Sequence, residues 1–499
     1  MQTWQFTGHI TFLGFGSVAR TALQLAGQLL SPVHVTVLDK IAISHEDAQK
    51  AADHANMQLI ESADAPDVGR MNRPTLCFVQ HTLTEENMAP VLSQYIRAGH
   101  ATFDFMFCVD SLDTLRTVQS LGSVYVNSSM EEWEHRPYPT QVMLYDVLLD
   151  HMAEVGAPMP TAAVDCGANP GLVTHFVIVA LFEMASRYAK SEACSLETRD
   201  EVSRLLLCDD REMVIGRLSE ILDIRRVHIT EEDTITPCDK DAIPPTAFPN
   251  TWSVESLRDE WFAAGEVAVG HHDRESFEEE GEKIIRANGT KFSTVPYPTF
   301  ALSEVPLDGK THTFVGRVVR HPETLEIAEI LRRRDSTGKL RTEAGLTQGP
   351  TVAFVYRPTE LTRTAALRPD AAEMPACLIS EREHGTLAGR EAMGGLVMSG
   401  LDGVNPMFCG SLISSEQTRE LGCKMNGTVM QVAISAVCHM KRAMQAPNKG
   451  VVMPHTFESR DLLSEAEPYL GDLVLTELDH LPLDWKTTCS ALGDGYQPL

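Results

Sequence analysis

A glycine-containing turn near the amino terminus has the residue types that bind a dinucleotide. Gly14, Gly16 and Ala19 directly follow the apolar run HITFL and precede a helical pattern. The first glycine permits a sharp turn, the second lets the backbone approach a pyrophosphate, and a small third residue allows close helix–strand packing. The first N–H groups of the helix would then bind the anion.

Asp39 is the expected partner of the ribose of such a cofactor. It follows the next apolar run, HVTVL, and lies 25 residues after Gly14, about where an acidic residue hydrogen-bonds the ribose 2′-hydroxyl. Since a carboxylate would repel the additional phosphate of NADP, we expect NAD. The alternative is a plain turn, with Asp39 capping a helix, but the order of strand, turn, helix and acid favours a cofactor site. The predicted cofactor-binding residues are Gly14, Phe15, Gly16, Ser17, Val18 and Asp39.

A second glycine-rich segment, CGANPG, ends a predicted strand over Thr161–Cys166 and opens a long helix from Leu172. We expect Asn169 to cap that helix and Pro170 to occupy its first turn, where a missing N–H costs nothing. A capping turn and an active-site amide explain these residues equally well. The flanking glycines indicate that something approaches this backbone closely.

Two further motifs carry side chains suited to a cationic substrate. In NTWSVE, Trp252 and Glu255 lie three positions apart. A tryptophan is more often a core residue, but its face can also hold a cation. His321 and Glu323 belong to HPE, which predicts the start of a helix over Glu323–Arg333. Because the two-histidine spacing of a metalloprotease helix is missing, we expect no metal.

The elements that must position these residues divide the chain into an α/β domain and a mixed α+β domain. Short apolar strands alternate with helices in the first third, which predicts a parallel sheet built from βαβ units. We therefore predict an N-terminal Rossmann NAD-binding domain over residues 1–163, completed by an apolar helix around 426–446. An inserted α+β substrate domain over 164–425 and a C-terminal extension over 447–499 complete the prediction.

Composition excludes several classes of partner. The 499 residues include 42 Lys plus Arg against 69 Asp plus Glu, a formal net charge of −27. Such a field repels nucleic acid and anionic membranes. We find no span-length apolar run, the longest candidate, 172–186, being interrupted by polar residues, and no signal sequence in Met1–Gly8. The 11 cysteines contain no C-x-x-C pair, which is typical of a reduced, cytoplasmic protein.

Taken together, the motifs resemble those of bacterial homospermidine synthase, a member of the saccharopine-dehydrogenase-like group of NAD enzymes. The shared stretches occur in the same order from Gly14 to Leu473: GFGSVAR, CGANPG, HITEEDT, NTWSVE, HPE, NGTVMQV, NKGVVMP and PYLGDL.

This resemblance implies a homodimer, tightly held NAD, and transfer of an aminobutyl group from putrescine or spermidine to putrescine. It further implies a pocket formed by Asn169, Glu231, Trp252, His321 and Glu323, with Glu131 at its entrance.

A mechanism follows from the chemistry of amines. A diamine is a dication at neutral pH, so its pocket needs carboxylates, for which Glu231, Glu255 and Glu323 are candidates. Hydride can leave the carbon beside nitrogen only after that nitrogen loses a proton, to His321 or a neighbouring carboxylate. Trp252 would stabilise the resulting iminium cation. A second amine then attacks, ammonia leaves, and hydride returns, so that NAD is recycled.

Two alternatives remain at this stage. A saccharopine- or carboxyspermidine-type dehydrogenase would condense an amine with a carbonyl and consume NAD(P)H. It would need an arginine to clamp a carboxylate, for which Arg320 or Arg357 would serve. A non-catalytic NAD sensor would instead turn over no amine.

Overall fold

The structure is a computed structural model that describes residues 6, 8–61, 73–154, 158–239, 241–277, 283–285, 289–479 and 481–490. Most of Met1–Gly8, and residues 491–499 of the expected C-terminal extension, lie outside this part. The chain divides into two compact units. Unit 1 comprises Met1–Pro139, Met143–Leu172 and Thr428–Tyr469, and unit 2 comprises Thr140–Val142, Val173–Gly427 and Leu470–Leu499.

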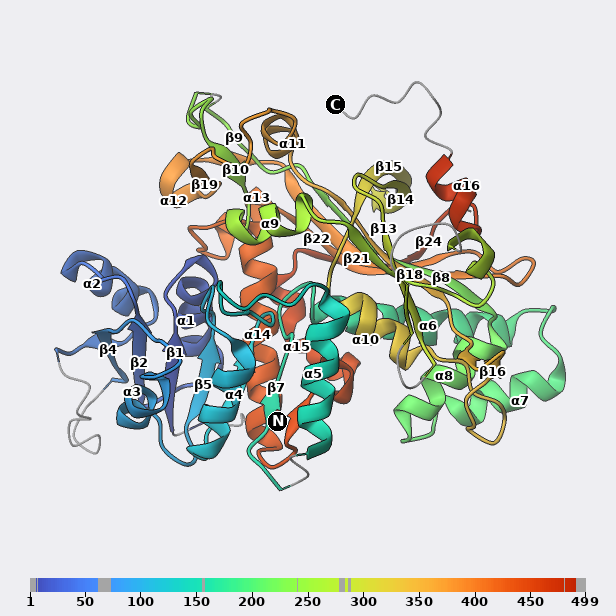
Figure 1. Cartoon of the computed structure of the whole chain (residues 1–499), viewed down its shortest axis with the longest axis horizontal. Coiled ribbons are helices and arrows are strands. Elements are labelled where there is room, and N and C mark those ends of the chain that lie inside the picture. Colours follow the sequence, from blue (N-terminus) through green and yellow to red (C-terminus); the bar gives the residue numbers. More distant parts are fainter. Residues whose placement is uncertain are drawn as a thin grey trace. The chain divides into compact units, whose positions relative to one another are not determined.

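Unit 1 contains an eight-stranded sheet of order β23-β7-β6-β5-β1-β2-β4-β3, in which every neighbouring pair is parallel. Leaving out the short β3 and β23, this is the strand order of a Rossmann fold, so the predicted fold class is confirmed. The strands β4, β2, β1 and β5 follow one another in Figure 1. The strands are β1 (His9–Leu13), β2 (His34–Asp39), β3 (Gln58–Leu59), β4 (Thr75–Gln80), β5 (Ala101–Asp104), β6 (Val124–Asn127), β7 (Ala162–Ala163) and β23 (Val451–Val452).

The predicted strand–turn–helix at the start of unit 1 is present, with the helix beginning at Ser17. Apolar residues of this helix recur at helical spacing, and its inner face is buried. The helices mainly assigned to this unit are α1 (Ser17–Leu29), α2 (His45–His54), α3 (Met88–Tyr95), α4 (Ser111–Ser120), α5 (Gln141–Glu154), α14 (Gly427–Gln445) and α15 (Ser459–Ala466), with 3-10 turns η3 (Pro454–Thr456) and η4 (Glu467–Tyr469).

The CGANPG segment differs from its prediction. The strand before it covers only Ala162–Ala163, and α6 (Leu172–Lys190) begins two residues after Pro170. The predicted Asn169 cap and first-turn Pro170 are therefore wrong. The reason is a closed turn: Leu172 N–H donates to Gly167 O at 2.9 Å, and Gly171 has φ +124°. A Cβ on Gly171 would lie 2.3 Å from Gly167 O, so only glycine fits there.

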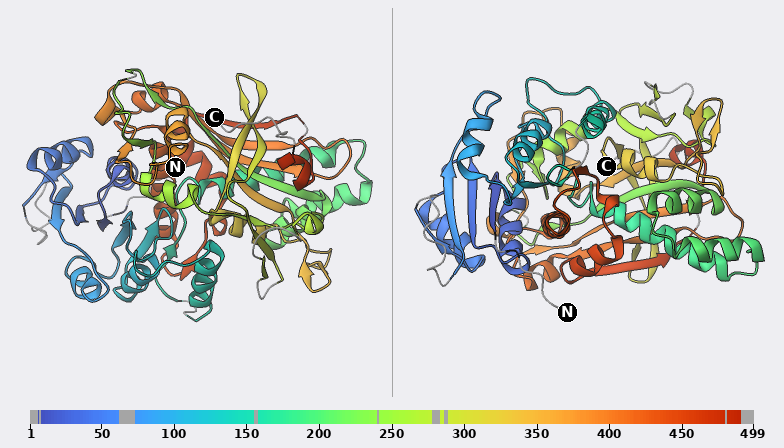
Figure 2. Two further views of the ribbon diagram at one scale, coloured as in Figure 1. Left: turned by 45° about the horizontal axis from the view of Figure 1, so that its top comes forward. Right: turned by 90° about the horizontal axis from the view of Figure 1, so that it is seen from below.

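Unit 2 is built on a ten-stranded mixed sheet of order β12-β13-β11-β18-β8-β21-β22-β24, with β14 and β15 joined to it through β18. The hairpin β14–β15 extends beyond the rest of the sheet (Figure 2, left). The strands are β8 (Ile224–Asp233), β11 (Gly265–Ala268), β12 (Lys283–Ile285), β13 (Lys291–Val295), β14 (Phe300–Leu307), β15 (Lys310–Val319), β18 (Thr351–Arg357), β21 (Arg390–Ser399), β22 (Met407–Ser414) and β24 (Asp472–Glu477).

Short two-stranded sheets and helices surround this sheet. The small sheets pair β10 (Phe248–Asn250) with β19 (Ala376–Leu378), β16 (Thr342–Glu343) with β17 (Leu346–Thr347), and β9 (Thr236–Pro237) with β20 (Leu387–Ala388). The helical segments are α6, α7 (Leu196–Leu205), α8 (Arg211–Ile221), α9 (Val254–Trp261), η2 (Arg274–Phe277), α10 (Glu323–Ile330), α11 (Glu360–Ala366), α12 (Glu381–His384), α13 (Ser415–Glu420) and α16 (Trp485–Ser490). Residues 447–499 thus contribute β23 to unit 1 and β24 and α16 to unit 2.

Helix α6 runs four residues further than the predicted 172–186. Its length and a mean hydropathy of 1.3 would suffice to cross a membrane, although the sequence was expected to contain no such run. However, 67% of its most apolar stretch is buried inside the protein, which is the behaviour of a core helix.

The two faces of the central sheet have different roles. Ala353 and Val355 of β18 belong to an apolar core that includes residues of β14, β15 and β22. The alternate residues Phe354 and Tyr356 point to the opposite face, because successive side chains of a strand alternate. Along that face, Gly395 of β21 allows Val177 of α6 to approach closely.

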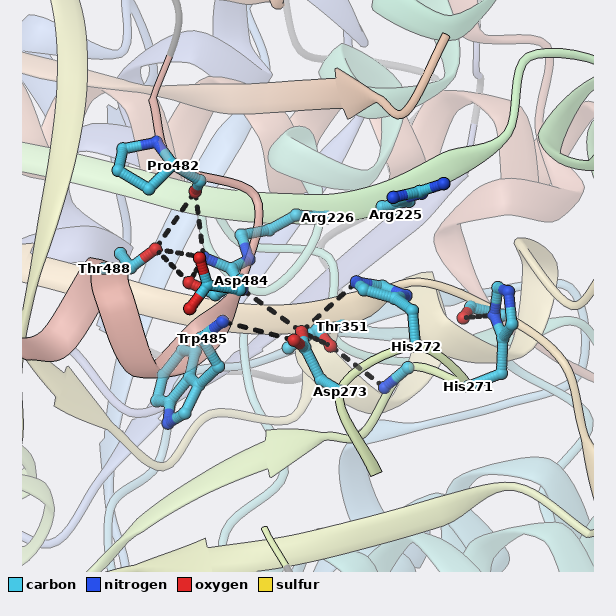
Figure 3. A network of polar contacts seen from close by, with 12 residues as sticks. Arg225, Arg226, His271, His272, Asp273, Thr351, Pro482, Asp484, Trp485 and Thr488 are labelled. Atoms are coloured by element: carbon cyan, nitrogen blue, oxygen red, sulfur yellow. Dashed lines mark hydrogen bonds and ion pairs between the residues drawn. The ribbon is translucent and has the colours of Figure 1, made fainter. Parts of the chain in front are cut away.

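A buried ion pair fixes the beginning of the central strands (Figure 3). Arg226 of β8 contacts Asp273 at 3.1 Å, and Thr351 of β18 donates to the same carboxylate at 2.6 Å. The backbone N–H of Trp485 also donates to Asp273, and Arg226 bonds the segment that leads into α16. This network ties the beginnings of β8 and β18 to helix α16.

Candidate functional site

The glycine turn of unit 1 has the geometry that its sequence predicts. Gly14 has φ +85°, and a Cβ there would lie 2.7 Å from Phe105 O, so this position requires glycine. A Cβ on Gly16 would meet nothing within 4 Å, so the backbone at the start of α1 faces open space. Gly16 has no capping side chain and the first turn of α1 has no acidic residue. Its N–H groups are therefore well suited to a phosphate.

Asp39 braces the same turn. Its two carboxylate oxygens accept hydrogen bonds from Phe15 N–H at 2.6 Å and Ile41 N–H at 2.7 Å. A carboxylate has about four lone-pair sites, so capacity for a ribose hydroxyl remains. The residues present thus fit a dinucleotide, with Ser17 and Val18 supplying the first helical N–H groups.

Two other predicted site residues lie in unit 1. Asn169 is half-buried in the closed turn between β7 and α6. Glu131 follows β6, and its backbone exchanges hydrogen bonds with Ser111, the first residue of α4.

The remaining predicted residues belong to unit 2, where strand pairing assembles a buried acidic cluster. Glu231 of β8 lies opposite Tyr356 of β18 and opposite Met393 of β21. Two residues further along the same face, Asp233 lies opposite Glu391. All three carboxylates are nearly or fully buried. Burying acids in this way is costly unless something positive or a hydrogen-bond donor offsets it.

His321 is held between two carboxylates. Its Nδ1 contacts Glu323 Oε2, and its Nε2 lies 3.6 Å from Glu260 Oε1. Burial lowers the pKa of His321, but the charges of Glu323 and Glu260 more than offset that effect and raise it to about 9. Burial raises the pKa of Glu260 to about 7, although nearby His321 and Arg320 oppose the shift. The site thus contains a protonated imidazole beside a carboxyl group that titrates near neutral pH.

Trp252 stands at the other end of the cluster. It follows β10 and precedes the Ser253 cap of α9, and its side chain is half-buried. Its indole N–H donates to Tyr356 Oη at 3.0 Å. Phe354 stacks on Tyr356, and His321 packs edge-on against Phe354 with ring centroids 4.9 Å apart. The structure therefore brings Trp252, Glu231, His321 and Glu323 into one neighbourhood of unit 2.

A cavity of about 430 Å³ opens where β8 and β18 end. Asp233 lines it, together with apolar residues such as Ile235, Ile243 and Leu361. Burial raises the pKa of Asp233 to about 6, while its hydrogen bond with Thr251 opposes the rise. This cavity combines an aliphatic lining with charges of both signs, since Glu232 and Glu360 line it together with Arg357 and Arg363.

Sequence reasoning missed Glu260, Tyr356, Asp233 and Glu391. Glu260 lies at the end of α9, eight residues after Trp252, where no local pattern distinguishes it from a surface carboxylate. Conversely, the predicted Glu255 is exposed at the start of α9, and its charge acts on Asp259. Among the described residues, no three potential ligands converge as a metal site requires.

Comparisons with known proteins agree with the motifs. No protein-family model matches the chain. The homospermidine synthase of Mesorhizobium japonicum is 26% identical over 507 residues, covering 96% of this chain and 92% of that protein. The homospermidine synthase of Blastochloris viridis is 25% identical over 501 residues, covering 95% and 92%. The resemblance to homospermidine synthases is thus confirmed over nearly the whole chain.

A solved structure shares the fold. The crystal structure of homospermidine synthase from Legionella pneumophila in complex with NAD has a TM-score of 0.77 to this chain at 22% identity. The similarity covers 99% of this chain and 95% of that one, so it includes the folds of both units.

Proposed function

We propose that this chain is an NAD-dependent homospermidine synthase, which moves an aminobutyl group from putrescine or spermidine to putrescine. The observation that carries this proposal is the acidic cluster of unit 2, in which Glu260 and Glu323 flank His321, the charge of Glu231 acts on the same imidazole, and Trp252 is held nearby through Tyr356. Similarity to homospermidine synthases along the full chain supports it.

Charge explains why an aliphatic amine suits this cluster. Glu260 Oε2 and Glu323 Oε1 are buried and have no hydrogen-bond partner in the described part of the chain. An ammonium group would supply both donors and positive charge, which removes the cost of burying these oxygens. The Trp252 face would add roughly 2 kcal/mol for a desolvated cation. Glu231 and Glu323 are therefore proposed to bind the amine.

The pKa values assign the proton transfer. His321, whose pKa is about 9, is already protonated at neutral pH. Glu260, whose pKa is about 7, is the better acceptor for the proton that the substrate ammonium must lose. We propose that Glu260 takes this proton, while His321 and Glu323 remain paired with each other beside it.

The glycine turn is the proposed NAD site, with Gly14, Phe15, Gly16, Ser17 and Val18 on the phosphates and Asp39 on the ribose. NAD, when bound there, would accept a hydride from the substrate and return it later, so that no net oxidation results. The resemblance also assigns Asn169 and Glu131 to the amine pocket, and the need of a diamine for carboxylates adds Glu255; these three remain proposals.

The dehydrogenase alternative is less well supported. Its carboxylate substrate would need a free arginine, but Arg357 pairs with Glu232 at 3.2 Å. Arg320 acts on the carboxylates Asp259 and Glu260. Arg357 would have to leave Glu232 to bind a substrate carboxylate, whereas the buried Nε of Arg320 has no hydrogen-bond partner among the described residues.

One assay separates the candidates. Purified protein is mixed with putrescine and substoichiometric NAD, NADH is followed by absorbance, and products are identified by mass spectrometry. Homospermidine and ammonia without net NADH support the proposal. One NADH per turnover would indicate a dehydrogenase, and no turnover would indicate a sensor.

We also propose a cytoplasmic homodimer that binds neither membranes nor nucleic acid. All 11 cysteines are free thiols, as expected in a reducing compartment. The net charge of −27 opposes binding to anionic surfaces. The dimer rests on the family resemblance, and light scattering of the purified protein tests it.

A further inference from the structure

Strand β18 carries a row of aromatic side chains that connects the two ends of the site. Phe354 and Tyr356 lie on one face of the strand, with ring centroids 5.7 Å apart and planes 19° apart. His321 packs against the outer side of this pair at Phe354, with centroids 4.9 Å apart. Trp252 lies at the other end, 6.2 Å from the Tyr356 ring. The stack therefore sets the separation between the histidine and the indole.

Trp252 needs such support because its backbone lies in a connection between elements. Its side chain is half-buried, and it lies between Thr251, the first residue after β10, and Ser253, the cap of α9. The indole has a single hydrogen-bond donor, which is directed at Tyr356 Oη at 3.0 Å. Because the donor lies in the ring plane, this bond fixes the direction in which the aromatic face points.

The acceptor of this bond stays unchanged over the working pH range. Tyr356 is fully buried, and burial together with the negative charges of Glu231, Asp233 and Glu391 raises its pKa well above the usual value. The hydroxyl therefore remains a neutral phenol rather than a phenolate. Its ring is also locked, since it is stacked on Phe354 in the middle of the sheet.

We propose that Tyr356 is a positioning residue for the reaction: its hydroxyl holds the Trp252 indole with its face toward the substrate cation. This inference rests on the proposed function. Tyr356 acts through Trp252 and needs no contact with the substrate. The orientation matters because a cation is attracted to the face of an aromatic ring and repelled by its edge.

A double-mutant cycle tests this role. Tyr356→Phe keeps the ring and its stacking and removes only the hydroxyl, so kcat/KM for putrescine should fall by about tenfold. In a Trp252→Phe background, which has no indole N–H, the same substitution should change kcat/KM by less than about twofold. Tyr297→Phe, a half-exposed tyrosine of the same unit, is the matched control and should leave kcat/KM unchanged. An equal loss in both backgrounds would overturn the proposal.

Fluorescence gives a readout that does not require turnover. The emission of wild type minus that of Trp252→Phe isolates the signal of this indole. Tyr356→Phe should shift that difference spectrum, because the indole N–H loses its acceptor, whereas Tyr297→Phe should not. An unchanged spectrum would overturn the positioning role even if homospermidine is formed. A shifted spectrum without homospermidine formation would instead refute the proposed function and leave the hydrogen bond established.

Discussion

His34 of unit 1 is buried beside two other histidines, whereas His321 of unit 2 is buried between two carboxylates. Burial lowers the pKa of His34 to about 4, and the neighbouring His9 and His100 lower it further. His34 bonds the neutral hydroxyls of Thr75 and Thr36 at 2.6 and 3.0 Å. In unit 2 the same burial is outweighed by Glu323 and Glu260, and the pKa of His321 rises to about 9.

The comparison shows that burial alone does not decide the charge of a histidine. The desolvation cost has the same sign in both units, and the neighbours determine which way the balance falls. The same contrast extends to the candidate sites. Unit 1 presents the uncapped start of α1, which suits an anion, while unit 2 presents carboxylates and an indole, which suit a cation.

The largest loss of activity should come from removing the carboxylate of Glu323, which contacts His321. In Glu323→Gln the pKa of His321 should fall, because burial is then opposed only by the charges of Glu260 and Glu231. We expect kcat to fall by about 100-fold or more, in the range found for acid–base groups. The pH–rate profile and an NMR titration of the imidazole measure both effects. Glu416→Gln, which changes an exposed residue of α13, serves as the control. A pH–rate profile of Glu323→Gln identical to that of wild type would remove Glu323 from the mechanism.

A smaller loss is expected when the aromatic face is removed. Trp252→Ala should reduce kcat/KM for putrescine by about 30-fold, which corresponds to a desolvated cation–π contact of roughly 2 kcal/mol. Trp252→Phe should lose less, since a phenyl face still attracts cations. The affinity for NAD, measured by calorimetry, should not change. Equal rates for the alanine and wild-type proteins would mean that the indole is only a packing residue.

The cofactor site of unit 1 can be tested by removing the carboxylate of Asp39. Asp39→Asn should weaken NAD binding and reduce the preference for NAD over NADP by about tenfold. The reason is that the carboxylate no longer bonds the ribose or repels the 2′-phosphate. Dissociation constants for both cofactors measure this effect. The matched control is Asp53→Asn on the exposed surface of α2. An unaltered ratio would assign Asp39 to bracing the turn at Phe15 and Ile41 alone.

The smallest effect concerns the stability of unit 1 in acid. The pKa of His100 is lowered by burial to about 4, so the folded state resists protonation that the unfolded chain accepts near pH 6.5. The contribution of His100 to the free energy of unfolding is therefore fully present above pH 6.5 and is lost as pH falls toward 4. His100→Gln should reduce the loss of unfolding free energy between pH 7 and 5 by about 1 kcal/mol, a value that allows for solvent screening of this partly buried side chain. Denaturant unfolding measures this difference, with exposed His45→Gln as control, and equal pH slopes would contradict it.

Local sequence was sufficient where a few neighbouring residues specify the geometry. The turn at Gly14, the start of α1, the position of Asp39 at the end of β2 and the start of α10 at Glu323 were all predicted from patterns within short segments. The CGANPG turn was mispredicted even though it is local. Its helix start depends on Gly171 adopting positive φ and on the bond from Leu172 to Gly167, which a capping pattern does not reveal.

The amine site could not be assembled from local patterns, because its members meet only through sheet pairing. Glu231 faces Tyr356 across β8 and β18, which are more than a hundred residues apart in sequence, and Asp233 faces Glu391 across β8 and β21. The residue types and motifs predicted an acidic, aromatic pocket for a cation. Only the tertiary structure decided that Glu260 would reach His321 and that Tyr356 would hold Trp252, because strand register and the packing of α9 determine which side chains share a buried face.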